Sequence, residues 1–222
     1  MSSDRPVRMG DQPLSRRERQ AQQTRDEILG AARRLFAERG YSRTSVRDIA
    51  EAAGVSSQTV YDSIGSKPAL VARLNDLIDT EASIVTIARA AGASSDPLEV
   101  AATSARVTRS ILEHCGDVVH ALVTGAAAEP DLEAALAEGQ RRHVAGAAMV
   151  VGRLQELDAL DASVARDQAV DTLAALSDVR LALVLRESYG WSLDRIEAWI
   201  ASSSQALLLR RPEPPGRRRA TR

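Results

Sequence analysis

Polar side chains able to hydrogen-bond to DNA gather in one short stretch: Ser57, Gln58, Thr59 and Tyr61. A glutamine can pair with adenine through two hydrogen bonds, a serine can donate to or accept from either base type, and a tyrosine hydroxyl can reach a phosphate oxygen. At about 100° per residue, Gln58 and Asp62 lie nearly opposite Val60. The spacing therefore predicts a short helix with one buried side and a polar outer side that suits a major groove.

A second short helix is predicted just before this one. Its start is placed at Thr44, whose hydroxyl can cap open amides, and apolar residues follow at helical spacing: Val46, Ile49, Ala50 and Ala53. Gly54 tolerates the positive φ of a sharp turn, and Ser56 can cap the next helix. Ser66 then caps a third start, where Lys67 could hold a phosphate beside open amides. This order predicts a helix-turn-helix, although the same spacing also suits helices that merely pack within an all-α domain.

Residues 24–70 resemble the N-terminal domain of the TetR family of transcriptional regulators. Five stretches carry the resemblance: ILGAARRLFAERGY at 28–41, TSVRDIA at 44–50, GVS at 54–56, TVY at 59–61 and SK at 66–67. The resemblance and the polar face together give the expected DNA contacts: Thr44, Ser45, Arg47, Ser56, Ser57, Gln58, Thr59, Tyr61 and Lys67. Ile64 stands where the family usually has an aromatic residue, which should alter core packing and leave the DNA contacts unchanged. Asp62 and Ser63 occupy positions where bulkier polar residues are common, so the operator sequence could be unusual. Beyond residue 90 the resemblance is one of architecture, and no ligand follows from it.

Composition agrees with a globular protein of the cytoplasm. The chain has 222 residues, 44% of them hydrophobic and 27% charged, and no apolar run approaches the ~18 residues of a membrane span. No apolar segment follows the N-terminal arginines, so a secretion signal is not expected. The single cysteine, Cys115, excludes an intrachain disulfide and a zinc site made of several thiolates. We therefore expect a cytoplasmic protein without a membrane partner.

Charge is distributed unevenly along the chain. Residues 1–70 carry 12 Lys and Arg against 9 Asp and Glu, residues 71–210 carry 12 against 20, and residues 211–222 carry 5 against 1. This pattern directs the positive field towards the predicted DNA module and favours one docking orientation. Residues 1–19 and 211–222 are expected to be flexible basic arms. The arginines Arg16, Arg17 and Arg19 could enter a minor groove, or they could simply be a solvated charge run.

The rest of the pattern is helical throughout, and the fold class expected is all-α, with about nine helices. We expect a DNA-binding domain over 20–68 and an effector-binding and dimerisation domain over 69–210. The bridge between them is a helix near 66–90 that could transmit a tilt. The later helices are expected at about 97–115, 117–127, 130–157, 162–189 and 192–209.

Candidates for the remaining sites lie in the second domain. A small-molecule effector could meet Arg109, His143 or Met149, although a core histidine and an arginine paired with an acidic neighbour are the simpler interpretations. Apolar stripes on the last two helices could form a four-helix dimer interface through Leu173, Leu181, Val184, Ile196, Trp199 and Ile200. The same stripes could instead only close the domain's core.

The function expected is that of a dimeric regulator, a repressor by preference, that binds a palindromic operator and is released by a small molecule. No catalytic residue, cofactor or metal is expected. The alternatives are an enzyme or metal sensor built on His114, Cys115 and His120, and a DNA-binding or architectural protein that needs no ligand. An enzyme would lack an orienting partner for Cys115, and a metal sensor would need a tight turn at Gly116 to bring its three ligands together. The DNA-binding protein without a ligand would differ by having no internal cavity and no response to an inducer.

Overall fold

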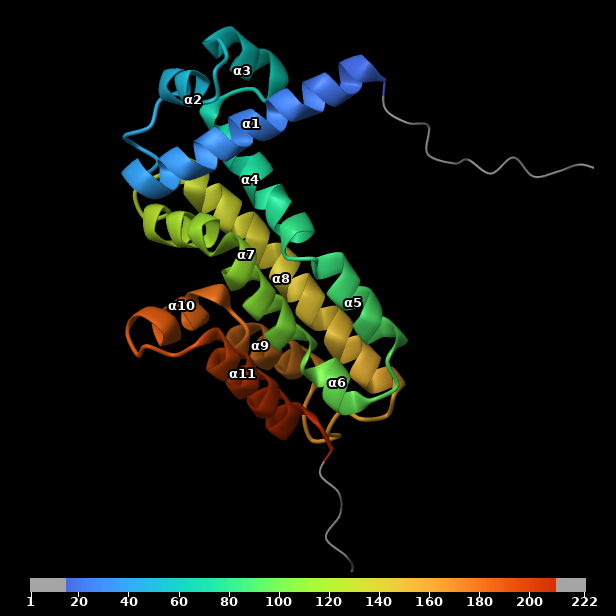
Figure 1. Ribbon diagram of the computed structural model, residues 1–222. Coiled ribbons are helices and arrows are strands. Elements are labelled where there is room, and N and C mark those ends of the chain that lie inside the picture. The colour runs from blue at the N-terminus through green and yellow to red at the C-terminus, as the bar shows by residue number, and fades with distance from the viewer. Residues whose placement is uncertain (1–14, 211–222) are drawn as a thin grey trace, which may run out of the picture.

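The computed structural model describes residues 15–210, and within this range the chain forms eleven helices and no strand beyond an isolated bridge between Leu160 and Leu209 (Figure 1). The all-α fold class is thus confirmed. The helices are α1 (Arg16–Arg39), α2 (Val46–Ala52), α3 (Ser57–Ser63), α4 (Lys67–Glu81), α5 (Ile84–Ala93), α6 (Pro97–Ala101), α7 (Thr103–Gly125), α8 (Pro130–Glu156), α9 (Arg166–Leu176), α10 (Val179–Glu187) and α11 (Leu193–Leu208).

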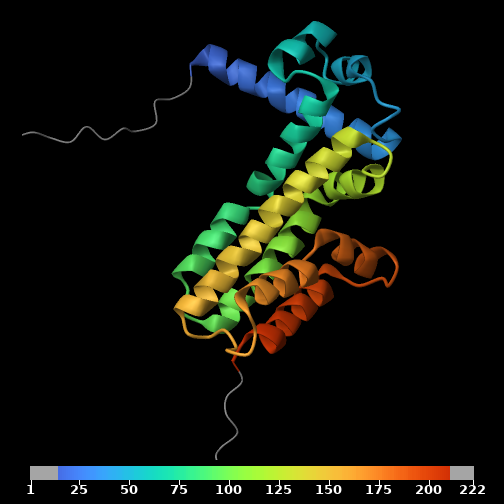
Figure 2. The ribbon, with the colours of Figure 1, turned by 180° about the vertical axis from the view of Figure 1, so that it is seen from behind.

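The molecule is elongated, with α1, α2 and α3 at one end (Figure 1). Helices α4 and α8 run side by side away from that end, and α5 continues in the direction of α4 along α8, as both views show (Figure 2). Helix α7 packs on the other side of α8, and α9, α10 and α11 complete the bundle beside α7 and α8. Among the described residues no helix is both long and apolar enough to cross a bilayer.

Two clusters of buried side chains hold the bundle together. The larger cluster runs without a break from Ile28 and Phe36 of α1, through Leu70 and Leu74 of α4, to Ile196 of α11. The smaller cluster lies at the end of the molecule away from α1–α3. It joins α6, α8, α9 and α11 around Val151, Leu154 and Leu173. The first cluster contains residues from both sides of the domain boundary expected between residues 68 and 69. The DNA module, residues 20–68, and the start of the second part therefore share one core.

The first helix begins earlier than the expected arm would allow. Ser15 accepts a hydrogen bond from the amide of Glu18, and the Glu18 carboxylate accepts from the amide of Ser15, which is a capping box. Residues 15–19 therefore belong to the cap and first turn of α1. The prediction of a flexible arm over 1–19 was wrong for these residues. The remainder of that arm, residues 1–14, and the tail over 211–222 lie outside the described residues.

Residues 15–210 contain eleven helices where about nine were expected, because the spacing of apolar residues does not reveal local breaks in a helix. The bridge expected over 66–90 ends as α4 at Glu81 and restarts as α5, with Ser83 between them in the left-handed region at a φ of 52°. The helix expected over 162–189 divides where the Asp178 side chain caps α10. The helix expected over 97–115 divides at Ala102, where α6 ends and α7 begins. The break expected near Gly116 is a kink inside α7, at Cys115, whose φ of −131° and ψ of 18° are not helical.

Candidate nucleic-acid interface and cavity

Helix α3 has the two-sided character that its sequence predicts. The Ser56 hydroxyl accepts from the amide of Thr59 at 3.0 Å, which fixes the start of the helix, and Gly54 turns the chain before it with a φ of 68°. Val60 is fully buried against the module, whereas Gln58 and Tyr61 are exposed, Tyr61 by 52%. α3 lies at one tip of the molecule, where its outer side is open to a partner (Figure 1).

The carboxamide of Gln58 is held by its neighbour one turn along α3. Its nitrogen donates to the carboxylate of Asp62 at 2.8 Å. This bond orients the amide that would read an adenine, and it places a negative charge beside the surface that would meet phosphates. Asp62 therefore has an effect on the reading face that the sequence pattern did not assign to it.

The start of α2 lies one residue later than predicted. Ser45, not Thr44, is the cap, and Asp48 completes a capping box with it. Thr44 is 1% exposed, and its hydroxyl donates to the carbonyls of Leu35 and Gly40. It therefore fixes the corner between α1 and α2, and as a DNA contact it was a wrong prediction.

The two basic DNA candidates differ in their surroundings. Arg47 is exposed and has no hydrogen bond or ion pair with the described residues. Lys67 is half-buried, and its amine lies 3.8 Å from the centre of the Tyr41 ring, a cation–π contact. Burial lowers the pKa of Lys67, and the carboxylates Glu129 and Asp131 act in the opposite direction. Lys67 thus starts α4 and contacts Tyr41, which follows the end of α1.

An arginine that the sequence pattern did not single out joins the DNA module to the rest of the molecule. The guanidinium of Arg33 in α1 binds Glu81 at the end of α4, Asp117 in α7 and the carbonyl of His114. Arg33 lies four residues after the buried Leu29 and three before the buried Phe36, so a charge on the apolar side of α1 was the available signal. These acceptors raise its pKa, with Asp117 the largest cause.

A cavity of about 640 Å³ lies along α4, α5, α7 and α8. Aliphatic side chains form most of its wall, and no Phe, Tyr or Trp lines it. Three glycines of α8 also face it, namely Gly139, Gly146 and Gly152, and a β-carbon at Gly146 or Gly152 would meet no atom within 4 Å. Small residues on α8 thus leave the space open. Such a site is typical of those that bind a small apolar molecule.

Two of the three effector candidates lie in the wall of this cavity. His143 and Met149 line it, although Met149 is also 64% exposed. Arg109 does not line it. Its guanidinium instead pairs with Asp194, Glu197 and Glu113, so the prediction that Arg109 faces an effector was wrong. These carboxylates raise its pKa, Asp194 most.

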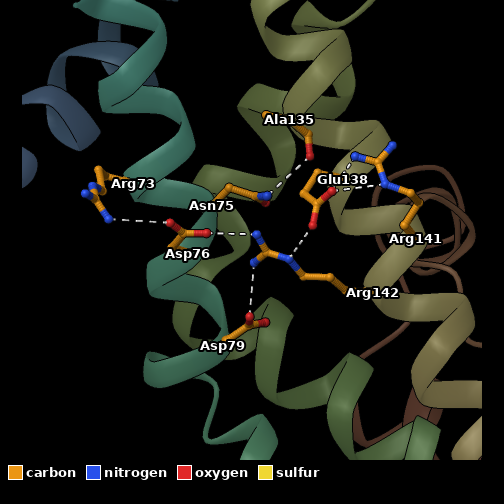
Figure 3. A network of polar contacts seen from close by, with 8 residues as sticks. All are labelled: Arg73, Asn75, Asp76, Asp79, Ala135, Glu138, Arg141 and Arg142. Atoms are coloured by element: carbon orange, nitrogen blue, oxygen red, sulfur yellow. Dashed lines mark hydrogen bonds and ion pairs between the residues drawn. The ribbon is translucent and has the colours of Figure 1, made fainter. Parts of the chain in front are cut away.

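The cavity wall includes an ionic cluster that ties α4 to α8 (Figure 3). Arg142 of α8 binds Asp76 at 2.8 Å and Asp79 at 3.0 Å, both on α4, and also Glu138 at 3.0 Å on its own helix. Next to it, the buried Asn75 donates to the carbonyl of Ala135 at 3.3 Å. The cluster therefore connects the cavity to the helix that begins at the DNA module.

The three residues considered for a metal or a nucleophilic site have separate partners. His114 bonds to the carbonyl of Ser110, His120 to Glu187, and the Cys115 thiol to Glu81. No group of three His, Cys, Asp or Glu side chains among the described residues could hold a metal ion. Burial and Glu81 raise the pKa of Cys115 to about 12, which disfavours the thiolate that a nucleophile requires.

Half of the expected dimer residues are inside the bundle. Leu173, Ile196 and Ile200 are at most 1% exposed and belong to the two core clusters, so their assignment to an interface was wrong. Both stripes contain inward and outward positions that apolar spacing alone does not separate. Leu181 and Trp199 are half-buried, and Val184 is 47% exposed. Leu207, at 52%, extends the exposed apolar surface on α11.

Comparison with known proteins agrees with this architecture. Residues 28–74 match the model of the family described as "Bacterial regulatory proteins, tetR family". The HTH-type transcriptional regulator TtgR of Pseudomonas putida is 43% identical over 63 residues, which span 28% of this chain and 30% of that protein. The match to this curated relative thus covers less than a third of its length.

Solved structures extend the likeness to nearly the whole chain. A TetR-family regulator from Syntrophomonas wolfei gives a TM-score of 0.72 at 16% identity, covering 84% of this chain and 95% of that one. SmeT, the repressor of the Stenotrophomonas maltophilia efflux pump SmeDEF, gives 0.65 at 19% identity over 87% and 100%, and a SmeT–triclosan complex gives 0.69 at 19% over 87% and 99%. These likenesses establish the fold.

The fold and the exposed α3 define a helix-turn-helix protein with a helical second part. Its residues 28–74 match the tetR family of bacterial regulatory proteins, and the resemblance found in the sequence is confirmed over these residues.

Proposed function

We propose that this protein is a ligand-responsive transcriptional regulator of the cytoplasm that binds operator DNA through α3 and releases it when a small molecule enters the cavity. The observation that carries the proposal is the position of α4. Lys67 at its start lies beside the DNA module, and Asp79 near its end lies in the cavity wall. A single helix thus has one end at each site. Repression is the proposed direction, since SmeT, which shares the fold, is a repressor.

In the proposed complex α3 enters a major groove. Gln58 reads a base edge, Ser57 and Thr59 support it from the first turn, and Tyr61 and Arg47 bind phosphates. Ser45 and Ser56 cap the N-termini of α2 and α3, which would lie near the backbone of the duplex. The DNA-binding part is proposed over 20–68 and the effector and dimer part over 69–210.

Two copies are proposed to pair through the outward positions of α10 and α11. Val184 and Leu207 supply exposed apolar area there, and the half-buried Leu181 and Trp199 border it. A twofold axis would place the two α3 helices about one DNA turn apart, ~34 Å, so the operator would be palindromic.

Release is proposed to occur by a shift between two states of the bundle. A ligand that prefers a wider cavity would favour a tilt of α4, and it can shift the equilibrium only by its difference in affinity for the two states. The clamp of Arg142 on Asp76 and Asp79 is where a change in the cavity wall would first act on α4. A protein that binds DNA without any ligand would have no use for a cavity of this size, which favours the responsive alternative.

Selection of bound sequences from random DNA tests the DNA part of the proposal. We expect a palindromic site whose affinity falls steeply with salt, and a smaller salt slope in a Lys67→Met variant. Gln58→Ala should weaken the preference at one position in each half-site by about 1–3 kcal/mol and leave the salt slope unchanged. Equal affinity for selected and scrambled sequences, or an unchanged base preference in Gln58→Ala, would refute the assignment of α3 as the reading helix.

A further inference from the structure

The cavity wall contains a hydrogen-bond acceptor that has no partner in the protein. Asn75 of α4 is 5% exposed and lines the cavity. Its carboxamide nitrogen donates to the carbonyl of Ala135, while its oxygen faces the backbone of Gly139 and has no hydrogen-bond partner among residues 15–210. In residues 15–210 the fully enclosed side-chain atoms without a partner are Arg106 Nε and Ser204 Oγ, so the Asn75 oxygen is still accessible. A donor on a molecule bound in the cavity could therefore hydrogen-bond to it.

Further polar residues line the same cavity. His143 is one turn beyond Gly139 on α8, and its Nε2 donates to the carbonyl of Ala174, which can only accept. Nε2 therefore carries the hydrogen, and in the neutral ring Nδ1 is an acceptor with no partner in the described part of the chain. The Ser104 hydroxyl, 8% exposed, and the amide nitrogen of Gln140 are likewise without a described partner, and both residues line the cavity. The cavity wall thus offers acceptors, a donor and a hydroxyl.

The charged groups of the wall are already neutralised by the protein. Arg142 belongs to a cluster of three carboxylates and three guanidiniums, formed by Arg73, Asp76, Asp79, Glu138, Arg141 and Arg142 (Figure 3). Arg153 donates to the carbonyl of Ser94 and to Glu156. Arg166 is half-exposed, 3.8 Å from Asp167. A charged ligand would lose its hydration in a largely aliphatic space without gaining an unpaired counter-charge.

We infer that the cavity takes an uncharged, largely aliphatic molecule carrying a hydroxyl group, which donates to Asn75 or His143 and accepts from Gln140 or Ser104. A hydroxyl both donates and accepts, so it can satisfy either set. A carboxylate offers only acceptors, and an ammonium only donors. Since aromatic side chains are absent from the wall, aliphatic carbon is the better fit. The inference rests on the proposed function in taking this cavity as the effector site.

The test compares three probes that differ only in their head group: decan-1-ol, decanoate and decylamine. Calorimetry on the full chain without DNA, at neutral pH and below the micellar concentrations, gives the three affinities. Decan-1-ol is expected to bind at least about tenfold more tightly than either charged probe, because each charged head group would be desolvated without a partner. Equal or tighter binding of decanoate or decylamine, or no binding of decan-1-ol, overturns the inference.

Matched variants locate the head group. Asn75→Leu and His143→Phe should each lower the affinity for decan-1-ol by about tenfold. Each should also reduce the ratio of the affinity for decan-1-ol to that for decanoate. His120→Phe changes an exposed histidine outside the cavity and should leave all three affinities unchanged. Ser104→Ala, a smaller change, serves if Asn75→Leu does not fold. Unchanged head-group selectivity in all the cavity variants overturns the inference.

The same probes separate this inference from the proposed function. If decan-1-ol binds with the expected selectivity but does not release operator DNA, the ligand response fails and the head-group assignment stands. If decanoate releases operator DNA and binds more tightly than decan-1-ol, the response stands and the head-group assignment fails.

Discussion

The guanidinium of Arg33 in α1 grips the carboxylate of Asp117 in α7 with two bonds, Nε to Oδ2 at 2.5 Å and Nη2 to Oδ1 at 2.6 Å. The residues are 84 positions apart, and both side chains are partly exposed. A third bond, to Glu81 at 2.7 Å, brings in the end of α4. The fixed fork of an arginine matches a carboxylate in two-point contact, so the pair sets both the distance and the angle between α1 and α7. The pair thus adds a polar contact to the apolar core that α1 shares with α4 and α7.

Replacing Arg33 by methionine should destabilise the fold by about 1–2 kcal/mol, because it leaves Asp117 and Glu81 without their cation at a half-buried junction. The neighbouring exposed Arg34 provides the control, and Arg34→Met should change the free energy of unfolding by less than about 0.5 kcal/mol. Urea unfolding of both variants and of Asp117→Asn would measure this. Additive effects of Arg33→Met and Asp117→Asn would show that the two side chains are not coupled.

The same pair predicts a pH dependence. Burial alone would raise the pKa of Asp117, but the hydrogen bonds and charge of Arg33 outweigh it, so the pKa lies below its ordinary value of 3.8. A carboxyl group with a depressed pKa in the folded state stabilises the fold above its unfolded pKa, and this contribution is lost as the pH falls through the folded value. The stability difference between the wild type and Asp117→Asn should thus be constant from neutral pH to about pH 5 and shrink below about pH 4. Urea unfolding across that range measures it, and a difference that grows on acidification would contradict the assignment.

Variants of Asp62 can distinguish two effects of this residue on α3: its hydrogen bond orients the Gln58 amide, and its negative charge lies near the expected phosphates. In Asp62→Asn the side-chain oxygen can still accept from Gln58, while the negative charge near the phosphates is gone. We expect tighter binding to all sequences with the base preference retained, by about two- to tenfold at low salt. Asp62→Ala also frees the Gln58 amide, so it should bind tightly but with a weaker preference at the base that Gln58 reads. Binding titrations on a panel of operator variants distinguish the two, and identical preferences in both would show that Asp62 does not position Gln58.

Filling the cavity from α8 should remove the ligand response. A β-carbon at Gly146 meets nothing within 4 Å, so Gly146→Leu can direct its side chain into the open space without displacing a neighbour. Loss of a helical glycine should also stabilise the fold by about 1 kcal/mol. Gly116→Leu is the control, since Gly116 is likewise helical and uncrowded but does not line the cavity. Thermal unfolding and operator release measure both effects, and a normal response in Gly146→Leu would place the effector elsewhere.

Much of the architecture could be predicted from the sequence because helix caps and apolar spacing are local signals. Gly54, Ser56 and Val60 have the roles their positions indicate, and the all-α class follows from the absence of an alternating pattern. The errors arose where the decisive partner is distant in sequence. Thr44 looks like a cap until the carbonyl of Leu35 is seen to bind it, and Arg109 looks free until Asp194 lies against it. Apolar stripes likewise do not reveal that Ile196 faces inward while Leu207 faces out.

Ser83 gives the bridge a property that a continuous helix would lack. A serine at a φ of 52° is held in a conformation that L-residues disfavour, and together with Ala82 it separates α4 from α5. In the tilt proposed for α4, its 15 residues would move as a rod of about 22 Å about that joint. A rotation of about 5° there displaces the Lys67 end by about 2 Å, by the same helix geometry. The helices beyond Ser83 would then keep their places while a molecule in the cavity changes the distance between the two α3 helices of the proposed dimer.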